Sequence, residues 1–210
     1  MRSLILLAGV TLLLFPNPVR ADACGSPPTE VTVEMPSASV KVDHVRDVAA
    51  YAAFGAAVGA STGGQGARWV INGLTKSSLS VGFTIEGRAA RGCFAPTRVR
   101  VTLGVGDPVQ VLITDKYAPG TCAYQAILEH EMQHVDILRR GRVIYAERFK
   151  QRVIEAAAMG PFPDMAAAQA RISGMIDVVS DEMKRALGAA NGSIDTAESY
   201  LANQARCPSW

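Results

Sequence analysis

Apolar and polar residues alternate in several short stretches of the first half of the chain, and this pattern predicts β-strands. Residues 30–34 and 39–42 predict two short strands. The clearest alternation covers residues 79–86, where every second residue is a large apolar one. Residues 98–114 contain two such runs around a Gly-Asp-Pro turn, so we predict a β-hairpin there. A small, mostly antiparallel sheet is therefore expected.

The second half of the chain changes to helical periodicity. Residues 122–159 predict one long helix, which a Gly-Pro-Phe-Pro segment ends. A second helix is predicted from the N-cap residue Asp164 to about Ala189, where Asn191–Gly192 ends it. A further helix is predicted at residues 47–58. The two long helices have similar lengths and suit an antiparallel hairpin. The fold class is therefore α+β: a small N-terminal sheet followed by a long C-terminal helical hairpin.

Residues 1–23 have the composition of a secretory signal peptide. Arg2 precedes an apolar run from Leu4 to Phe15, and small-residue cleavage patterns follow it. The apolar run is too short to cross a bilayer. We therefore expect a periplasmic or secreted protein that has no membrane attachment once the signal peptide is cleaved.

The charge of the chain argues against nucleic acid as a partner. The formal net charge is +2, and it falls to +1 when Arg2, Arg20 and Asp22 leave with the signal peptide. Proteins that bind nucleic acid usually carry a strongly basic patch or stripe. A nearly neutral chain does not indicate such a surface.

The first long helix contains His130-Glu131-Met132-Gln133-His134, an H-E-x-x-H motif. Residues four apart lie on one face of a helix, so both imidazoles can bind one metal ion. Glu131 is turned by about 100° from His130 and lies beside that ion, where its carboxylate can take a proton from a bound water. This is the zinc metallopeptidase arrangement. The alternative is a chance match with ordinary half-buried histidines, although two of the three histidines of the chain lie in the motif.

A catalytic zinc site of this kind needs a third protein ligand and one open position. In a helical hairpin, the second helix returns to the level of His134, and the segment after it lies beside the motif. Asp195 in that segment is our first candidate for the third ligand, Glu198 the second and His44 the third. Tyr200 is a candidate catalytic residue, because its hydroxyl could donate a hydrogen bond to the oxyanion of a tetrahedral intermediate.

The four cysteines predict two disulfides, because an even number in an exported protein usually pairs. The helical hairpin brings the C-terminal segment back to the start of the first helix at Cys122. We therefore predict a Cys122–Cys207 disulfide, and by elimination a Cys24–Cys93 disulfide. No C-x-x-C pair occurs, so a cysteine zinc site is not expected.

The segments T-C-A-Y-Q-A-I-L-E-H-E-M-Q-H-V-D-I and I-D-T-A-E-S-Y, with the helical pair between them, resemble a bacterial family of predicted secreted zinc-dependent proteases. That family has H-E-x-x-H on a helix and a later Y-D-x-x-T-x-H-G element. The resemblance implies that His130 and His134 are metal ligands, that Glu131 is the general base, and that Asp195 matches the later aspartate. The chain departs from the family pattern at Ile194, Glu198, Tyr200 and Leu201.

Together these features predict an exported zinc metallopeptidase with one zincin-like domain over residues 24–210, β-rich over 24–117 and helical over 118–210. A zinc-activated water would hydrolyse a bond of a peptide or protein substrate, with Glu131 as general base. Residues 109–114 lead into the motif helix, so we expect this strand edge to pair with an extended peptide. Two alternatives stay open: a non-catalytic metal-binding module of the cell envelope, and a zinc hydrolase of a non-peptide amide.

Overall fold

A computed structural model describes residues 24–25, 28–46, 48 and 72–210. The predicted signal peptide and nearly all of the helix predicted at 47–58 lie outside these residues. The described elements are β1 (Glu30–Glu34), β2 (Val40–Val45), β3 (Gly73–Lys76), β4 (Leu79–Ala90), β5 (Cys93–Val105), β6 (Val109–Thr114), α2 (Cys122–Ala157), α3 (Met165–Ile194) and α4 (Ala197–Ala205). Strands therefore precede helices, and the predicted α+β class is confirmed.

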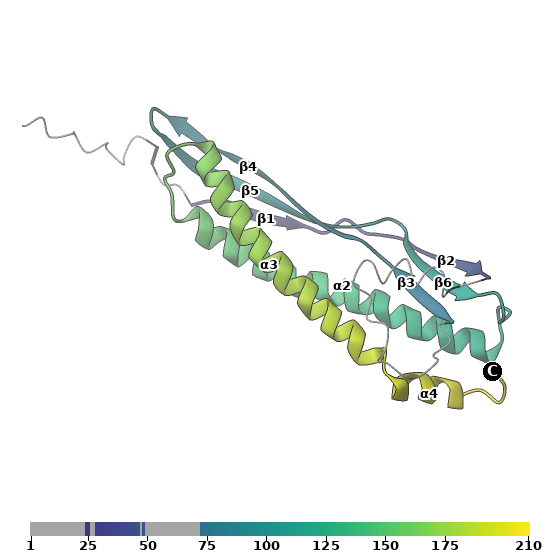
Figure 1. Cartoon of the computed structure of the whole chain (residues 1–210). Helices are drawn as coiled ribbons and strands as arrows, with labels where there is room; N and C mark the ends of the chain where they lie inside the picture. The colour runs from purple at the N-terminus through teal and green to yellow at the C-terminus, as the bar shows by residue number, and fades with distance from the viewer. Residues whose placement is uncertain (1–23, 26–27, 47, 49–71) are drawn as a thin grey trace, which may run out of the picture.

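The predicted small sheet is divided into two three-stranded sheets with the orders β1-β5-β4 and β2-β6-β3. In each sheet the central strand pairs in parallel with one neighbour and antiparallel with the other. The longest ladder joins β4 to β5 through a tight turn at Gly92, whose φ of 77° glycine adopts without steric cost. The strands of the second sheet lie beyond the ends of the first, along the same side of α2 (Figure 1).

The hairpin predicted over residues 98–114 is wrong, because β5 and β6 belong to different sheets. β6 runs parallel to β2, just as β5 runs parallel to β1, so the chain continues from one sheet to the next instead of reversing. The Asp107 carboxylate, at the turn between β5 and β6, accepts hydrogen bonds from the main-chain N–H of Ser39 (2.9 Å) and its hydroxyl (2.6 Å). These bonds join the segment between β1 and β2 to the segment between β5 and β6, two of the places where the chain passes from one sheet to the other.

The two long helices form the predicted antiparallel hairpin (Figure 1). α2 is continuous over 36 residues, and α3 begins after Asp164, whose side chain caps its N-terminus as predicted. The predicted stop at Asn191–Gly192 is wrong, because α3 continues to Ile194. Gly192 does not take the positive φ of a helix-ending glycine, and the side chain of Asn191 binds His134 instead of capping the helix.

The core lies between the helical hairpin and the two sheets. α2 contacts strands of both sheets, and α3 contacts β4 and β5. Gly141 allows the two helices to approach closely, because a Cβ at this position would collide with the side chain of Leu187. The fully buried residues come from both helices and both sheets, among them Val99, Val101, Leu103, Val111, Ile113, Phe149, Val153, Ile172 and Met183. This packing sets the position of α3 along the axis of α2, and therefore which residues of α3 lie beside the H-E-x-x-H motif.

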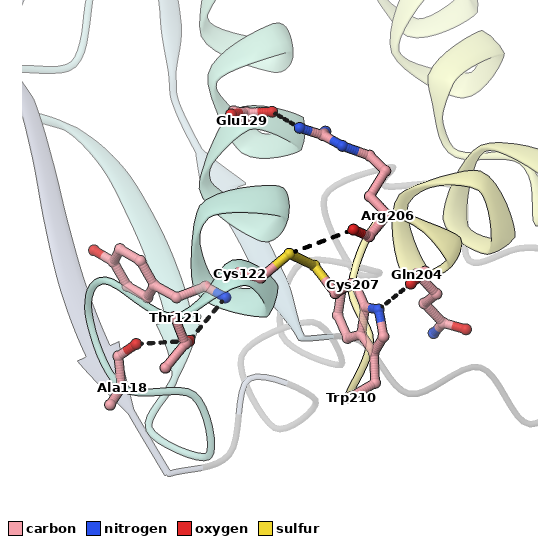
Figure 2. The surroundings of a disulfide bond; sticks show 9 residues. Ala118, Thr121, Cys122, Glu129, Gln204, Arg206, Cys207 and Trp210 are labelled. Atoms are coloured by element: carbon pink, nitrogen blue, oxygen red, sulfur yellow. Dashed lines mark hydrogen bonds and ion pairs between the residues drawn. A yellow bond between two sulfur atoms is a disulfide. The ribbon is translucent and has the colours of Figure 1, made fainter.

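Both predicted disulfides are confirmed. Cys24–Cys93 joins the first described residues to the start of β5, and Cys122–Cys207 joins the start of α2 to the segment after α4 (Figure 2). Two disulfides are typical of proteins in an oxidising extracellular or periplasmic environment. None of the helices within the described ranges combines the length and the apolar character that crossing a bilayer requires.

Candidate metal centre

α2 carries both histidines of the motif on its inner side. His130 is 3% exposed, and the side chain of His134, one turn later, is 13% exposed. The centroids of the two rings lie 5.1 Å apart. The helical spacing thus presents two imidazoles to one buried position, as the sequence predicted.

Asp195, the residue directly after α3, completes a group of three possible ligands. Its Oδ1 lies 3.1 Å from His130 Nε2 and 3.2 Å from His134 Nε2. One ligand atom from each of the three residues falls within 4.8 Å of the others, so the group could hold a metal ion. The antiparallel hairpin brings Asp195 there, because α3 returns along α2 as far as the motif.

The other two candidates for a third ligand lie elsewhere. Glu198 is an exposed residue in the first turn of α4. His44 is an exposed residue of β2, and its ring lies 5.4 Å from the ring of Tyr124. Neither residue belongs to the His130–His134–Asp195 group.

Tyr200 contacts this group from α4. Its hydroxyl donates a hydrogen bond of 3.0 Å to Asp195 Oδ1, and its ring lies 5.0 Å from the ring of His130. Burial and the neighbouring Asp195 carboxylate raise the pKa of Tyr200 above its usual range, so the phenol keeps its proton and remains a donor. The hydroxyl that we predicted to contact an oxyanion is thus directed at the carboxylate in this structure.

Asn191 orients His134, a role that the sequence did not indicate. Its Oδ1 lies 2.9 Å from His134 Nδ1. The amide oxygen is an acceptor only, so Nδ1 carries the proton and Nε2 faces Asp195. Asn191 and Asp195 are four residues apart at the end of α3, a spacing that places both on one helical face. That spacing is the sequence signal that could have identified Asn191.

The charges of the centre are strongly coupled. Burial alone would lower the pKa of His134, but hydrogen bonds to Asp195 and Asn191 raise it to about 9. Asp195 is also partly buried, yet hydrogen bonds from His130 and His134 hold the pKa of its carboxyl well below the usual range. Two imidazole nitrogens around an ionised carboxylate are a donor set that a divalent cation can occupy by displacing protons.

Glu131 lies beside this group with its carboxylate turned toward β3. The residue is 3% exposed, and Thr75 Oγ1 donates a hydrogen bond of 2.8 Å to Glu131 Oε2. Burial raises the pKa of the Glu131 carboxyl, and the nearby imidazoles of His134 and His130 oppose this shift. The sequence did not identify Thr75, because the strand G-L-T-K is too short to show an alternating pattern.

The expected substrate edge at residues 109–114 is wrong, because β6 is the central strand of its sheet and pairs with β2 and β3. Among the strands of the described residues, β3 is the edge strand on the side of Glu131. A strand whose two edges are already paired cannot receive a further strand, whereas an edge strand can. Any pairing with an extended peptide in this sheet would therefore involve an edge strand and not β6.

Comparison of the chain with protein-family models, with curated proteins and with solved structures found no match. What this centre can do must therefore follow from its own side chains.

Proposed function

We propose that the protein is an exported zinc metallopeptidase in which His130, His134 and Asp195 hold the metal and Glu131 is the general base. The observation that carries the proposal is the convergence of the three ligand atoms within 4.8 Å, with a buried glutamate next to them. Two imidazoles and one carboxylate match the ligand types of catalytic zinc sites, which use three protein ligands and leave a fourth position open. The disulfides support export.

Each residue has a definite task in this proposal. A bound zinc ion would supply a Lewis acid and a nucleophilic water at neutral pH. Glu131 would accept a proton from that water and return it to the leaving amine, which is the task of a general base. Asn191 holds His134 in the tautomer that leaves Nε2 for the metal, and Tyr200 holds the Asp195 carboxylate.

A peptide is the proposed substrate because β3, an edge strand among the described residues, borders the general base. β3 pairs with β6 on one side, and its residue Thr75 contacts Glu131. An extended peptide that pairs with such an edge is held by main-chain hydrogen bonds, which suits a substrate with an extended backbone. The resemblance of the motif segment to predicted secreted zinc-dependent proteases favours the same class of reaction.

The test is to compare Glu131→Gln with the wild-type chain in zinc content and in cleavage of a peptide library. We expect about one zinc per chain in both proteins. Turnover should fall by about 10²- to 10⁴-fold in the variant, since an amide cannot accept the proton. Glu147→Gln is the matched control, because Glu147 is an exposed glutamate of the same helix.

Other results would point to other functions. Equal zinc content in wild type and in a His130→Ala/His134→Ala variant would refute the proposed metal centre, because zinc would then bind without its two histidines. A wild-type chain that binds zinc but cleaves no peptide would favour one of the two alternatives. If the wild-type chain cleaves a non-peptide amide and Glu131→Gln does not, the protein is the amide hydrolase. If neither a peptide nor a non-peptide amide is cleaved, the results favour the non-catalytic module.

A further inference from the structure

Two residues of β3, Gly73 and Thr75, enclose the carboxylate of Glu131, and we refer to them as the β3 cradle. We propose that the β3 cradle positions the general base: Gly73 leaves the space for the carboxylate, and Thr75 holds one of its two oxygens. The inference rests on the proposed function, in which Glu131 moves the proton. It makes Thr75 a positioning residue, because it acts through Glu131.

The geometry of a strand places both cradle residues on the same side. Residues two apart in a strand face the same way, so Gly73 and Thr75 both face α2. A Cβ on Gly73 would lie 2.5 Å from Glu131 Oε1, 2.7 Å from Ile127 Cγ2 and 2.8 Å from Glu131 Cγ, so a larger residue would displace the carboxylate together with the Ile127 side chain. Thr75 Oγ1 lies 2.8 Å from Oε2. The carboxylate thus occupies a space that only glycine leaves open.

The Thr75 hydroxyl has two acceptors, and both belong to Glu131. They are the side-chain Oε2 at 2.8 Å and the main-chain carbonyl oxygen at 3.0 Å. While Glu131 is ionised, the hydroxyl proton can point to Oε2. Once Glu131 has taken up a proton, the hydroxyl can turn its own proton to the carbonyl oxygen. The side chain can therefore stay in place through both protonation states.

The cradle also distinguishes the two carboxylate oxygens. Oε2 is bound by Thr75, whereas Oε1 makes no hydrogen bond within the part of the chain that the structure describes. Among the described residues, Oε1 is therefore the carboxylate oxygen whose lone pairs have no protein donor. Because Glu131 is only 3% exposed, water compensates little for the loss of the Thr75 bond. Loss of the bond would therefore let the carboxylate move, and a misplacement of about 1 Å can cost about 100-fold in rate.

Thr75→Val tests the cradle, because it removes the hydroxyl and keeps the shape of the side chain. With a peptide substrate of the wild-type enzyme, we expect kcat to fall by about 10- to 100-fold while KM and zinc affinity stay unchanged. Thr75→Ser should recover most of the loss. Thr102→Val is the matched control, since Thr102 is a half-buried threonine of β5 in the other sheet. Gly73→Ala should lower kcat by the second route, displacement of the carboxylate.

A crystal structure of zinc-loaded Thr75→Val gives a readout that is independent of activity. We expect the Glu131 carboxylate to leave its position against Gly73; an unchanged position overturns the inference. If Glu131→Gln loses turnover but Thr75→Val is as fast as Thr102→Val, the inference fails and the proposed function stands. If Glu131→Gln is itself as active as wild type, the proposed function fails and the inference fails with it.

Discussion

The Cys122–Cys207 disulfide is predicted to control the affinity of the metal centre, whereas Cys24–Cys93 is not. Cys207 follows α4, the helix that carries Tyr200, and Cys122 begins α2, the helix that carries the histidines (Figure 2). No residue of α4 is buried. The disulfide is thus a main attachment of α4 to α2, with the ion pair Arg206–Glu129 (2.6 Å) and the contacts of Tyr200.

The two disulfides provide a matched pair for stability. They join residues that are 85 and 69 positions apart in the sequence. The entropy of closing loops of these lengths in the unfolded chain corresponds to about 4.5 kcal/mol at 25 °C for either disulfide. Replacing either pair of cysteines by serines should therefore lower the free energy of unfolding by a similar amount.

The two disulfides should differ in their effect on zinc affinity. Without Cys122–Cys207, α4 can separate from α2 and remove the Tyr200 hydroxyl from Asp195 Oδ1. Losing an outer hydrogen bond to a metal ligand typically costs about 10- to 100-fold in metal affinity. We expect that loss in Cys122→Ser/Cys207→Ser and no change in Cys24→Ser/Cys93→Ser. The measurement is competition for zinc with a chromogenic chelator, on samples whose helical content is checked by circular dichroism.

Equal zinc affinity in the two serine variants would refute this reasoning. Tyr200→Phe provides a second test that keeps both disulfides, because it removes only the hydroxyl that contacts Asp195. It should weaken zinc binding as much as the loss of Cys122–Cys207 does. If Tyr200→Phe retains the affinity of the wild-type chain, α4 does not act on the centre through this hydroxyl.

Two further predictions concern the centre itself. Asp195→Ala should weaken zinc binding far more than Glu198→Ala. The reason is that Asp195 Oδ1 lies 3.1 Å and 3.2 Å from the two histidine nitrogens, whereas Glu198 is exposed. Similar zinc affinities in the two variants would contradict this prediction. In the metal-free protein, NMR should show His134 titrating near pH 9 instead of near 6.5. Because folding raises the pKa of His134, its contribution to the free energy of unfolding is complete below pH 6.5 and is lost as the pH rises through about 9. A titration of His134 near pH 6.5 in the folded chain would contradict this prediction.

The sequence alone determined the features that depend on neighbouring residues. A helix is set by periodicity and end signals within a few positions, so α2, α3 and the N-cap at Asp164 were predicted. The H-E-x-x-H motif needs only that helix to bring His130 and His134 together. The match in length between the two helices then sufficed to predict that Asp195 lies near the motif and that Cys122 pairs with Cys207.

Only the tertiary structure decided which distant segments meet. β6 has an alternating pattern that suits a hairpin with β5 equally well, but its partners are β2 and β3, and no local signal specifies them. The sequence predicts a helix end at Asn191, because the contact of its side chain with His134 is made across to another helix and has no local signal. Gly73 and Thr75 matter only because β3 packs against Glu131. Periodicity is a property of one segment, whereas strand partners and buried hydrogen bonds depend on how several segments pack together.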